Sequence, residues 1–396
     1  MAKILVAWEL GGGFGHVGRQ KPIVERLVAR GHHVTAALKY PEMGESFYQC
    51  DDVTYLQAPY QKAMTEQAIV PPSTFAHVLH NVCFSNYETA ASRFASWRAI
   101  MREVSPDVIF FDHSPTALLA ARTCPAARVV CGTGFCCPPP CEMYPDWTPW
   151  RNNEPGQLRN DEQRVLRVMN RLLGDAGEEP LERVSQIFED VEDTFLQTYA
   201  ELDHFRSSRE TEYYGIMPTT GGEKVRWPAG DGKRIFVYVR PIPVLASLLK
   251  AFTRWELPAV LFVPTLADEV KARYRSPFVR FAERAVDLNR IASECDICVT
   301  IGSHATTAAL LLAGKPQLTL PYDLEKTLIA RNVMEMGAGL SAPPDNAKAT
   351  LEALRMLLVD ASFAKAAQDF AAKYENINRE TQPDLMVARI ESLWSH

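Results

Sequence analysis

Short apolar runs alternate with helical periodicity through the first half of the chain. The runs predict strands at 3–8, 33–38, 53–57, 107–112 and 128–132. After the first run, Ile23, Val24, Leu27 and Val28 recur on one face of an amphipathic helix. Alternation of this kind predicts a parallel sheet covered by helices.

A second alternation begins beyond the middle of the chain. Its apolar runs predict strands at 234–239, 259–263, 295–301 and 317–320. A polar helical pattern over about 158–198 and a stretch rich in glycine and proline separate the two halves. We therefore expect an α/β protein with two doubly wound, Rossmann-like domains facing a cleft, where ligands bind at the carboxyl ends of the strands. The expected divisions are a domain at 1–215, a linker at 216–232, a domain at 233–379 and a helix at 380–396 that braces the first domain.

Composition narrows the function classes. The chain has 396 residues and a net charge of −6, and it contains no long basic block, which argues against nucleic acid as a partner. No apolar run is long enough to cross a bilayer. The first residues enter a strand at once and lack the three-part pattern of a secretory signal, so we expect a cytoplasmic protein.

The loop after the first strand is the most informative feature. Residues 9–18 read ELGGGFGHVG and precede the first helix. Glycines let the backbone turn sharply and approach a ligand, and a helix N-terminus suits an anion or an oxygen-rich substrate. His16 places a titratable base at that position. A tight turn with an incidental histidine is the alternative.

The same loop contains Gly13, Gly15 and Gly18 in the spacing of a dinucleotide-binding fingerprint. An NAD site also needs an acidic residue at the end of the second strand. Here strand 33–38 runs into Lys39. We therefore reject an NAD site.

A second strand, loop and helix arrangement lies in the other half. Strand 295–301 runs into a loop of small and polar residues, after which an apolar helix extends to Gly314. Hydroxyls and free N–H groups at a helix start suit a phosphate, although an ordinary N-cap has the same composition. The loop residues are Gly302, Ser303, His304, Ala305, Thr306 and Thr307.

The nine cysteines suggest neither a disulfide framework nor a metal site. Cys295 and Cys298 lie in a predicted strand, where residues three apart point to opposite faces. Four others cluster in a proline-rich loop, with a spacing that fits no standard zinc or iron–sulfur pattern. They are Cys131, Cys136, Cys137 and Cys141. We expect no bound metal.

Taken together, these segments resemble the GT-B glycosyltransferases that use nucleotide sugars, including bacterial macrolide glycosyltransferases. The resemblance covers nearly the whole chain. It rests on the order and spacing of 8–34, 105–112, 214–215, 227–228, 295–307, 313–321, 330–331 and 337–339.

The resemblance implies an inverting transferase that moves a sugar from a nucleotide-sugar donor to a hydroxyl of a small-molecule acceptor. His16 matches the family's general base, and Asp112 matches the acid that orients it, with His113 as a competitor. Gly302, Ser303, His304, Thr306 and Thr307 match the loop that holds the donor diphosphate. The donor, linked to UDP or TDP, is a co-substrate, and no other cofactor is implied.

The chain departs from the family at the donor site. Ile301 stands where the family has a histidine that touches the diphosphate, and Ala305 replaces a glycine. The acidic-Gln pair that contacts sugar hydroxyls is Glu325-Lys326 here. Lys326 would suit an acidic sugar or a phosphate. These departures leave open a noncatalytic GT-B protein that binds a nucleotide or activates another enzyme, and, more remotely, a sugar epimerase.

The acceptor region is less distinctive. The loop after strand 128–132 is rich in proline and aromatic residues, which suits an apolar or ring-shaped acceptor. Aromatic packing within a long loop is the alternative. The acceptor residues that we expect are Glu9, Phe14, His113 and Phe135.

Overall fold

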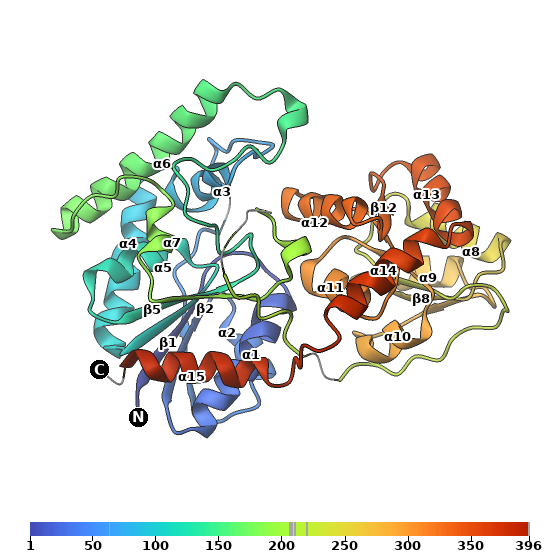
Figure 1. Ribbon diagram of the computed structural model, residues 1–396, viewed down its shortest axis with the longest axis horizontal. Helices are drawn as coiled ribbons and strands as arrows, with labels where there is room; N and C mark the ends of the chain where they lie inside the picture. Colours follow the sequence, from blue (N-terminus) through green and yellow to red (C-terminus); the bar gives the residue numbers. More distant parts are fainter. Residues whose placement is uncertain (63, 206–208, 210, 219–220, 395–396) are drawn as a thin grey trace. The chain divides into compact units, whose positions relative to one another are not determined.

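The computed structural model describes residues 1–62, 64–205, 209, 211–218 and 221–394 (Figure 1). The chain forms two compact units. Unit 1 consists of Met1–Thr198, Phe205–Met217 and Arg379–His396, and unit 2 consists of Tyr199–His204 and Pro218–Asn378. Both units are built on a parallel sheet, as the alternation of strands and helices predicts.

The sheet of unit 1 has six strands in the order β3-β2-β1-β4-β5-β6. The strands are β1 (Lys3–Trp8), β2 (His33–Leu38), β3 (Val53–Gln57), β4 (Val108–Asp112), β5 (Ala127–Gly132) and β6 (Asp193–Leu196). The expectation of helix over 158–198 is wrong beyond α6 (Pro155–Ala176). This helix ends at Gly177, whose φ of 80° is left-handed, and the chain then turns through α7 (Gln186–Glu189) into β6.

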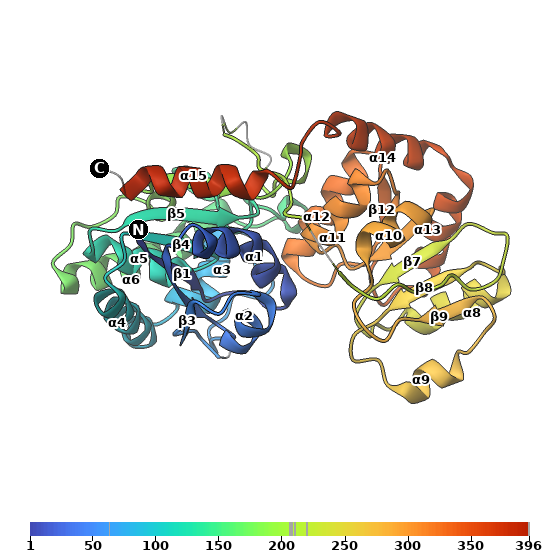
Figure 2. The same ribbon diagram turned by 90° about the horizontal axis from the view of Figure 1, so that it is seen from below.

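Helices cover both faces of this sheet. The remaining helices of unit 1 are α1 (Phe14–Ala29), α2 (Pro41–Phe47), α3 (Phe75–Leu79), the π-helical turn η1 (His80–Phe84), α4 (Tyr87–Val104), α5 (Pro115–Ala120) and α15 (Gln382–Trp394). Helix α15, at the end of the chain, lies beside α1 in both views (Figures 1 and 2). Short 3-10 turns occupy Ala121–Thr123 and Pro149–Arg151.

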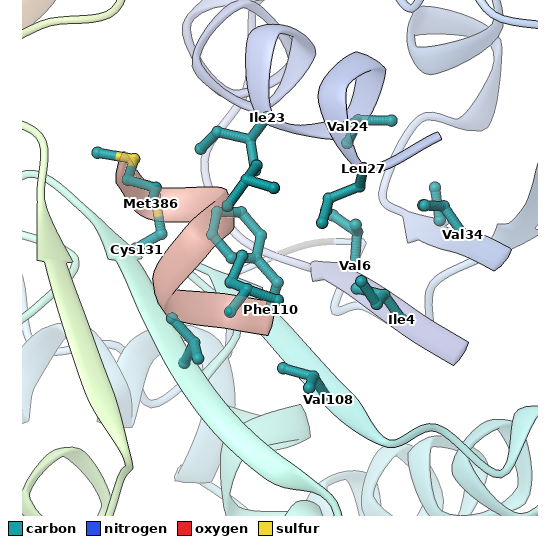
Figure 3. Close-up of a cluster of buried hydrophobic side chains, with 14 of the residues drawn as sticks. Ile4, Val6, Ile23, Val24, Leu27, Val34, Val108, Phe110, Cys131 and Met386 are labelled. Carbon is teal, nitrogen blue, oxygen red and sulfur yellow. The ribbon is translucent and has the colours of Figure 1, made fainter. Parts of the chain in front are cut away.

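The core of unit 1 joins the two ends of the chain. Ile23 and Leu27 from α1 and Met386 from α15 pack over Val6 and Phe110 of the central strands (Figure 3). All five side chains are fully buried, and each stabilises the fold by about 1.5–3 kcal/mol relative to exposure. The last helix is therefore part of the unit 1 core.

The sheet of unit 2 also has six strands, in the order β12-β11-β10-β7-β8-β9. If the strands of each unit are numbered from one along the chain, both sheets have the order 3-2-1-4-5-6. Each unit therefore has its switch point between its first and fourth strands. The strands are β7 (Ile235–Tyr238), β8 (Ala259–Phe262), β9 (Val279–Phe281), β10 (Ile297–Thr300), β11 (Gln317–Thr319) and β12 (Gly339–Ser341). The sequence reading missed β9 and β12.

Two helical layers enclose the second sheet. Its helices are α8 (Leu245–Arg254), α9 (Asp268–Arg273), α10 (Leu288–Glu294), α11 (His304–Leu312), α12 (Leu324–Glu335), α13 (Ala347–Val359) and α14 (Ser362–Lys373), with a 3-10 turn at Ala200–Leu202. Leu248 of α8 and Leu354 of α13 join the core on one face, and Ile291 of α10 and Leu310 of α11 join the core on the other.

Two expectations need correction here. The stretch 216–232 is not purely a linker, because Val225 is buried in a core of unit 2 and Glu223 bridges to Val286. Cys295 lies outside the strand, at the C-cap of α10, while Cys298 lies in β10. Their sulfur atoms are therefore 3.5 Å apart and do not point to opposite faces.

Among the helices of the described residues, none combines the length and apolar character needed to cross a bilayer.

Candidate active site

The first site lies at the switch point of the unit 1 sheet. Strands β1 and β4 are neighbours, with Trp8 paired in register with Asp112. The chain leaves β1 through the glycine loop, and Gly13, with a φ of 78°, precedes the first residue of α1. This turn places His16 in the first turn of the helix, at the carboxyl ends of both strands.

His16 and Asp112 form a buried pair. The Nδ1 atom of His16 lies 2.9 Å from Oδ1 of Asp112, and the side chains are 9% and 0% exposed. The indole of Trp8 stacks on the imidazole, with ring centroids 4.9 Å apart. The pair that the resemblance implies is therefore assembled, with its ring held from one side by an aromatic face.

Asp112 is held in its ionised form. Burial alone would raise the pKa of its carboxyl, but Arg19, His16 and Gln20 outweigh burial and lower that pKa. Gln20 donates from Nε2 to Oδ2 at 2.7 Å, and Nε of Arg19 lies 3.8 Å from the same oxygen. The hydroxyl of Tyr48 in turn donates to Gln20. An ionised carboxylate only accepts hydrogen bonds, so Nδ1 of His16 carries the proton.

This tautomer leaves Nε2 of His16 as the basic nitrogen. Burial lowers the pKa of His16, and the opposing effect of Asp112 does not fully compensate. The ring is consequently neutral near pH 7. Nε2 makes no hydrogen bond within the described residues and is not among the fully buried polar atoms that lack a partner, so it retains solvent contact. Such a nitrogen can accept a proton from a substrate hydroxyl.

His113 occupies a strained position beside this pair. Its φ is 47°, an uncommon conformation for a non-glycine residue, and its carbonyl accepts from the N–H of Leu10 at 3.1 Å. Its ring lies 6.2 Å from that of His16 and 6.0 Å from that of Phe135. The carboxylate of Asp112 bonds to His16, so His16 rather than His113 completes the pair.

The other expected acceptor residues lie in contrasting environments. Glu9 is buried, accepts from Trp97 Nε1 at 2.8 Å and from the Thr116 N–H at 2.5 Å, and has a pKa raised by burial. Both of its oxygens are engaged within the protein, so this geometry does not favour an acceptor contact. Phe14 is 62% exposed and stacks on Phe47.

Phe135 belongs to an aromatic cluster in the long loop after β5. It stacks on Trp147, with centroids 5.4 Å apart, and both lie edge-on to Phe75. Phe135 and Trp147 are 7% and 5% exposed. Most aromatic surface of this loop is therefore used in packing, while Trp150 is 49% exposed.

Lys39 makes a contact with the glycine loop that the sequence did not predict. It follows β2, where a dinucleotide site would have its acidic residue, and its Nζ donates to the Gly11 carbonyl at 2.7 Å. Burial lowers the pKa of Lys39, with Glu9 opposing. A cation therefore bonds to the glycine loop at the position where a dinucleotide site has its acid.

The second site lies at the switch point of unit 2. Gly302 follows β10 with a φ of 80°, and a Cβ there would lie 3.0 Å from the Lys326 carbonyl oxygen. Glycine thus lets the loop pack against the start of α12. Ser303 is the N-cap of α11 but makes no side-chain cap bond, so the first N–H groups of α11 keep their capacity for an external acceptor.

The side chains of α11 are less available than its backbone. His304, Thr306 and Thr307 are at most 9% exposed. The His304 ring stacks near that of His204, 6.2 Å away. The Oγ1 of Thr307 is buried without a hydrogen-bond partner in the described structure. Ile301 is 5% exposed and belongs to the unit 2 core.

Two cations flank one tyrosine at this site. Nζ of Lys326 lies 4.7 Å from the Tyr322 ring centroid, and the Arg240 guanidinium lies 5.3 Å from it. Lys326 also pairs with Asp323 at 2.7 Å, while Glu325 follows the Asp323 cap in the first turn of α12. Although burial lowers the pKa of Lys326, the carboxylates of Glu325 and Asp323 raise it overall.

The sequence reading missed Arg240. It stands two residues beyond Tyr238 of β7, which pairs in register with Thr300, and Gly302 stands two residues beyond Thr300. Arg240 and the glycine therefore leave the sheet at the same level. A cation directly after the first strand of a doubly wound half was the available signal.

No metal centre is evident in the part of the chain that the structure describes, where no three His, Cys, Asp or Glu side chains gather as potential ligands.

Comparison with known proteins agrees with this architecture. No family model matches the sequence. Elloramycin glycosyltransferase ElmGT of Streptomyces olivaceus is 38% identical over 91 residues. This match spans 23% of the chain and 22% of ElmGT, about a fifth of the relative's length.

Solved structures match over nearly the whole chain. The spinosyn rhamnosyltransferase SpnG is 17% identical, with a TM-score of 0.65 over 99% of this chain and 100% of SpnG. The calicheamicin glycosyltransferase CalG4 is 17% identical, with a TM-score of 0.72 over 99% of this chain and 98% of CalG4. Glycosyltransferase VinC, solved with DTDP, is 16% identical, with a TM-score of 0.67 over 98% and 99%. The chain has the two-domain GT-B fold that these glycosyltransferases share, as the resemblance implied.

Proposed function

We propose that the chain is an inverting glycosyltransferase that moves a sugar from a UDP- or TDP-linked donor to a hydroxyl of a small-molecule acceptor. The observation that carries the proposal is the buried pair of His16 and Asp112 at the switch point of unit 1. A hydroxyl is a poor nucleophile, and a neutral imidazole held by an ionised carboxylate is suited to deprotonate it.

In the proposed reaction, Nε2 of His16 takes the proton of the acceptor hydroxyl. The hydroxyl oxygen forms a bond to the anomeric carbon, and the bond from that carbon to the diphosphate oxygen breaks. The nucleoside diphosphate leaves with the electron pair. Attack opposite to the leaving group inverts the configuration. Asp112 stabilises the imidazolium that forms.

Donor binding is proposed for the loop of unit 2. The N–H groups at the start of α11 would donate to a diphosphate oxygen, and Gly302 allows close backbone approach. Arg240 and Lys326 would supply the positive charge that the family's histidine supplies at the position of Ile301. In this proposal no further cofactor takes part.

The acceptor is proposed to be ring-shaped and largely apolar. Phe14 is exposed two residues before His16 and could contact such a molecule. A neighbouring structure of SpnG contains spinosyn aglycone, and the VinC structure contains DTDP. These molecules suggest which acceptors and donors to test first.

A noncatalytic GT-B protein is the second candidate. It is favoured by Ile301, which is buried in place of the family's histidine, and by Lys326, which already pairs with Asp323. Such a protein would bind a nucleotide, or activate another enzyme, without transferring sugar.

The test combines nucleotide binding with transfer. Calorimetric titrations with UDP and TDP come first, followed by assays of nucleotide release and glycoside mass with a panel of donors and aglycones. His16→Ala should bind nucleotide as the wild type does and lose about 10²- to 10⁴-fold in turnover. Wild-type turnover in His16→Ala contradicts the assignment of the base. If neither UDP nor TDP binds at millimolar concentration, the transferase proposal fails.

A further inference from the structure

A cavity in unit 1 is lined by none of the residues of the His16 centre. It has a volume of about 600 Å³ and lies where α6 faces η1 and the loop around Ile69. This volume falls within the range of small-molecule sites. Figure 1 shows α6 as the long helix near α3. Turn η1 directly follows α3 in the chain.

The wall opposite α6 is fixed by side-chain hydrogen bonds. Asn81 accepts from the Ile69 N–H at 2.7 Å and donates to the Ile69 carbonyl at 2.9 Å. Nε2 of His80 lies 3.1 Å from the Gln67 carbonyl oxygen and must donate to it. Both residues belong to η1, a π-helical turn of the kind that often marks functional sites.

His80 adds a buried polar group to this wall. The residue is 6% exposed and lines the cavity. Its Nδ1 is buried and has no hydrogen-bond partner in the described structure. In a neutral imidazole whose Nε2 donates, Nδ1 is an acceptor. A buried polar atom of this kind is normally satisfied, and an O–H or N–H group of a ligand in the adjoining cavity is one way to satisfy it.

The wall on α6 is strongly basic. Arg164, Arg167 and Arg171 line the cavity at spacings of three and four, which places them on one helix face. Arg164 lies 3.4 Å from Asp161, and the Arg171 guanidinium lies 3.5 Å from the Tyr87 ring centroid. Arg167 makes no ion pair with any described residue.

The lining of the cavity also has an apolar part and carries no acidic side chain among the described residues. Ile69, Phe84 and Val168 supply apolar surface beside the arginines. Two carboxylates lie just outside the lining, Asp161 beside Arg164 and Asp175 bonded to the Tyr87 hydroxyl. Three arginines against two carboxylates leave this region basic in a chain whose net charge is −6. Arginine forks match carboxylate and phosphate groups geometrically.

We propose that this cavity binds a small organic anion, a carboxylate or phosphate carried on an apolar ring or chain. Arg167 and Arg171 hold the charged group, and Phe84 and Val168 cover the apolar part. The site goes beyond the proposed transferase function, because its occupancy requires neither His16 nor a nucleotide.

The test is calorimetry on the full chain with three probes: 1-naphthyl phosphate, 1-naphthoate and neutral 1-naphthol. Each titration is run both without UDP and with saturating UDP, which occupies any donor site. We expect one anion per chain, bound at least about 10-fold more tightly than 1-naphthol, as a charged hydrogen bond allows. Arg167→Gln and Arg171→Gln should each weaken anion binding about 10-fold. Arg159→Gln, an exposed change on the same helix that does not line the cavity, should leave it unaltered.

Thermal melts of each variant establish that the fold is retained. Binding of both anions supports a general organic-anion site, and binding of 1-naphthyl phosphate or 1-naphthoate alone supports the corresponding class. The proposal is overturned if 1-naphthol binds as tightly as the anions, or if both glutamine variants bind the anions as the wild type does. It is also overturned if no anion binds at millimolar concentration. These readouts do not depend on transferase activity, so the two proposals fail separately.

Discussion

A Cβ atom on Gly11 would lie 2.3 Å from Nε2 of His16. The glycine has a φ of 78°, so a side chain there would be strained as well as obstructed. The imidazole therefore occupies space that only glycine leaves open. The glycines of this loop let the backbone turn and approach a ligand, and Gly11 also leaves room for the imidazole of His16.

Gly11→Ala should accordingly displace His16, which lowers turnover, and should destabilise the fold only moderately. We expect a loss of roughly 1–2 kcal/mol in the free energy of unfolding and at least a 10-fold loss in kcat. Gly12→Ala is the matched control, because a Cβ there meets nothing within 4 Å. Denaturant melts and initial rates measure both quantities. Equal rates in the two variants would contradict the steric argument.

The pH profile should have its acidic limb below pH 6.5. Burial lowers the pKa of His16 from its ordinary value of 6.5, so the basic form persists to lower pH than in an unfolded chain. The same shift means that its contribution to stability is complete above pH 6.5 and declines as pH falls through the lowered pKa. Rates of transfer and thermal melts between pH 4 and pH 8 check both statements. An acidic limb above pH 6.5 would show that His16 is not the titrating base.

Asp112→Asn should lower turnover and move that limb further toward acid. The carboxylate raises the pKa of His16, and a neutral amide cannot, so the imidazolium loses stabilisation. We expect a loss of about 10- to 10⁴-fold, the upper figure being that of the serine-protease triad. Asp107→Asn, just before the opposite end of β4, is the control because Asp107 bonds to the Lys3 N–H. A purely structural role for Asp112 would lower stability and leave the limb in place.

Arg240→Gln should weaken nucleotide binding by about 1–3 kcal/mol, or roughly 5- to 150-fold. Lys326→Gln should have a smaller effect, because Nζ of Lys326 already pairs with Asp323. Lys250→Gln, an exposed change on α8, serves as the control. Titrations of UDP and TDP provide the affinities. If Arg240→Gln binds both nucleotides as the wild type does, the proposed charge contact is absent.

Elemental analysis should find no stoichiometric metal at the cysteine-rich loop. Metal ligation requires thiolates, and burial raises the pKa of the Cys131 and Cys137 thiols well above the ordinary range. The purified chain should contain less than about 0.1 zinc or iron atom per molecule. About one zinc per chain, lost in Cys137→Ser, would show that the loop binds metal after all.

Long apolar runs were the predictable part of this fold. Strands such as β1 and β4 are buried on both faces and read directly as strands. Strands β9 and β12 have three residues each and lie at the sheet edges, where only one residue of each strand is buried. Strand β11 is equally short, but all three of its residues are buried and its apolar run was recognised. Strand β6 follows a polar segment, and its residues were included in the helical pattern expected over 158–198. Sheet pairing rather than local preference defines these strands.

The site was predictable where a residue type stood out against its surroundings. His16 in a glycine loop and Asp112 at a strand end carried such a signal, and they lie together. Glu9 carried the same kind of signal, yet its carboxylate is used to bind Trp97 and the start of α5. Arg240 carried a weaker signal, a cation directly after a strand, and its position level with Gly302 comes from the register of β7 with β10. Which contacts a polar side chain makes depends on neighbours distant in sequence.

The polypeptide passes between the units at 198/199, 204/205, 217/218 and 378/379. Neither unit is thus a single contiguous stretch of the gene product. A hybrid made by one crossover within 216–232 would join a first unit to a foreign α15, whose Met386, Val387 and Ile390 must fit its core. Recombination between distant homologues that exchanges unit 2 would have to transplant both 199–204 and 218–378 and keep the parental final helix.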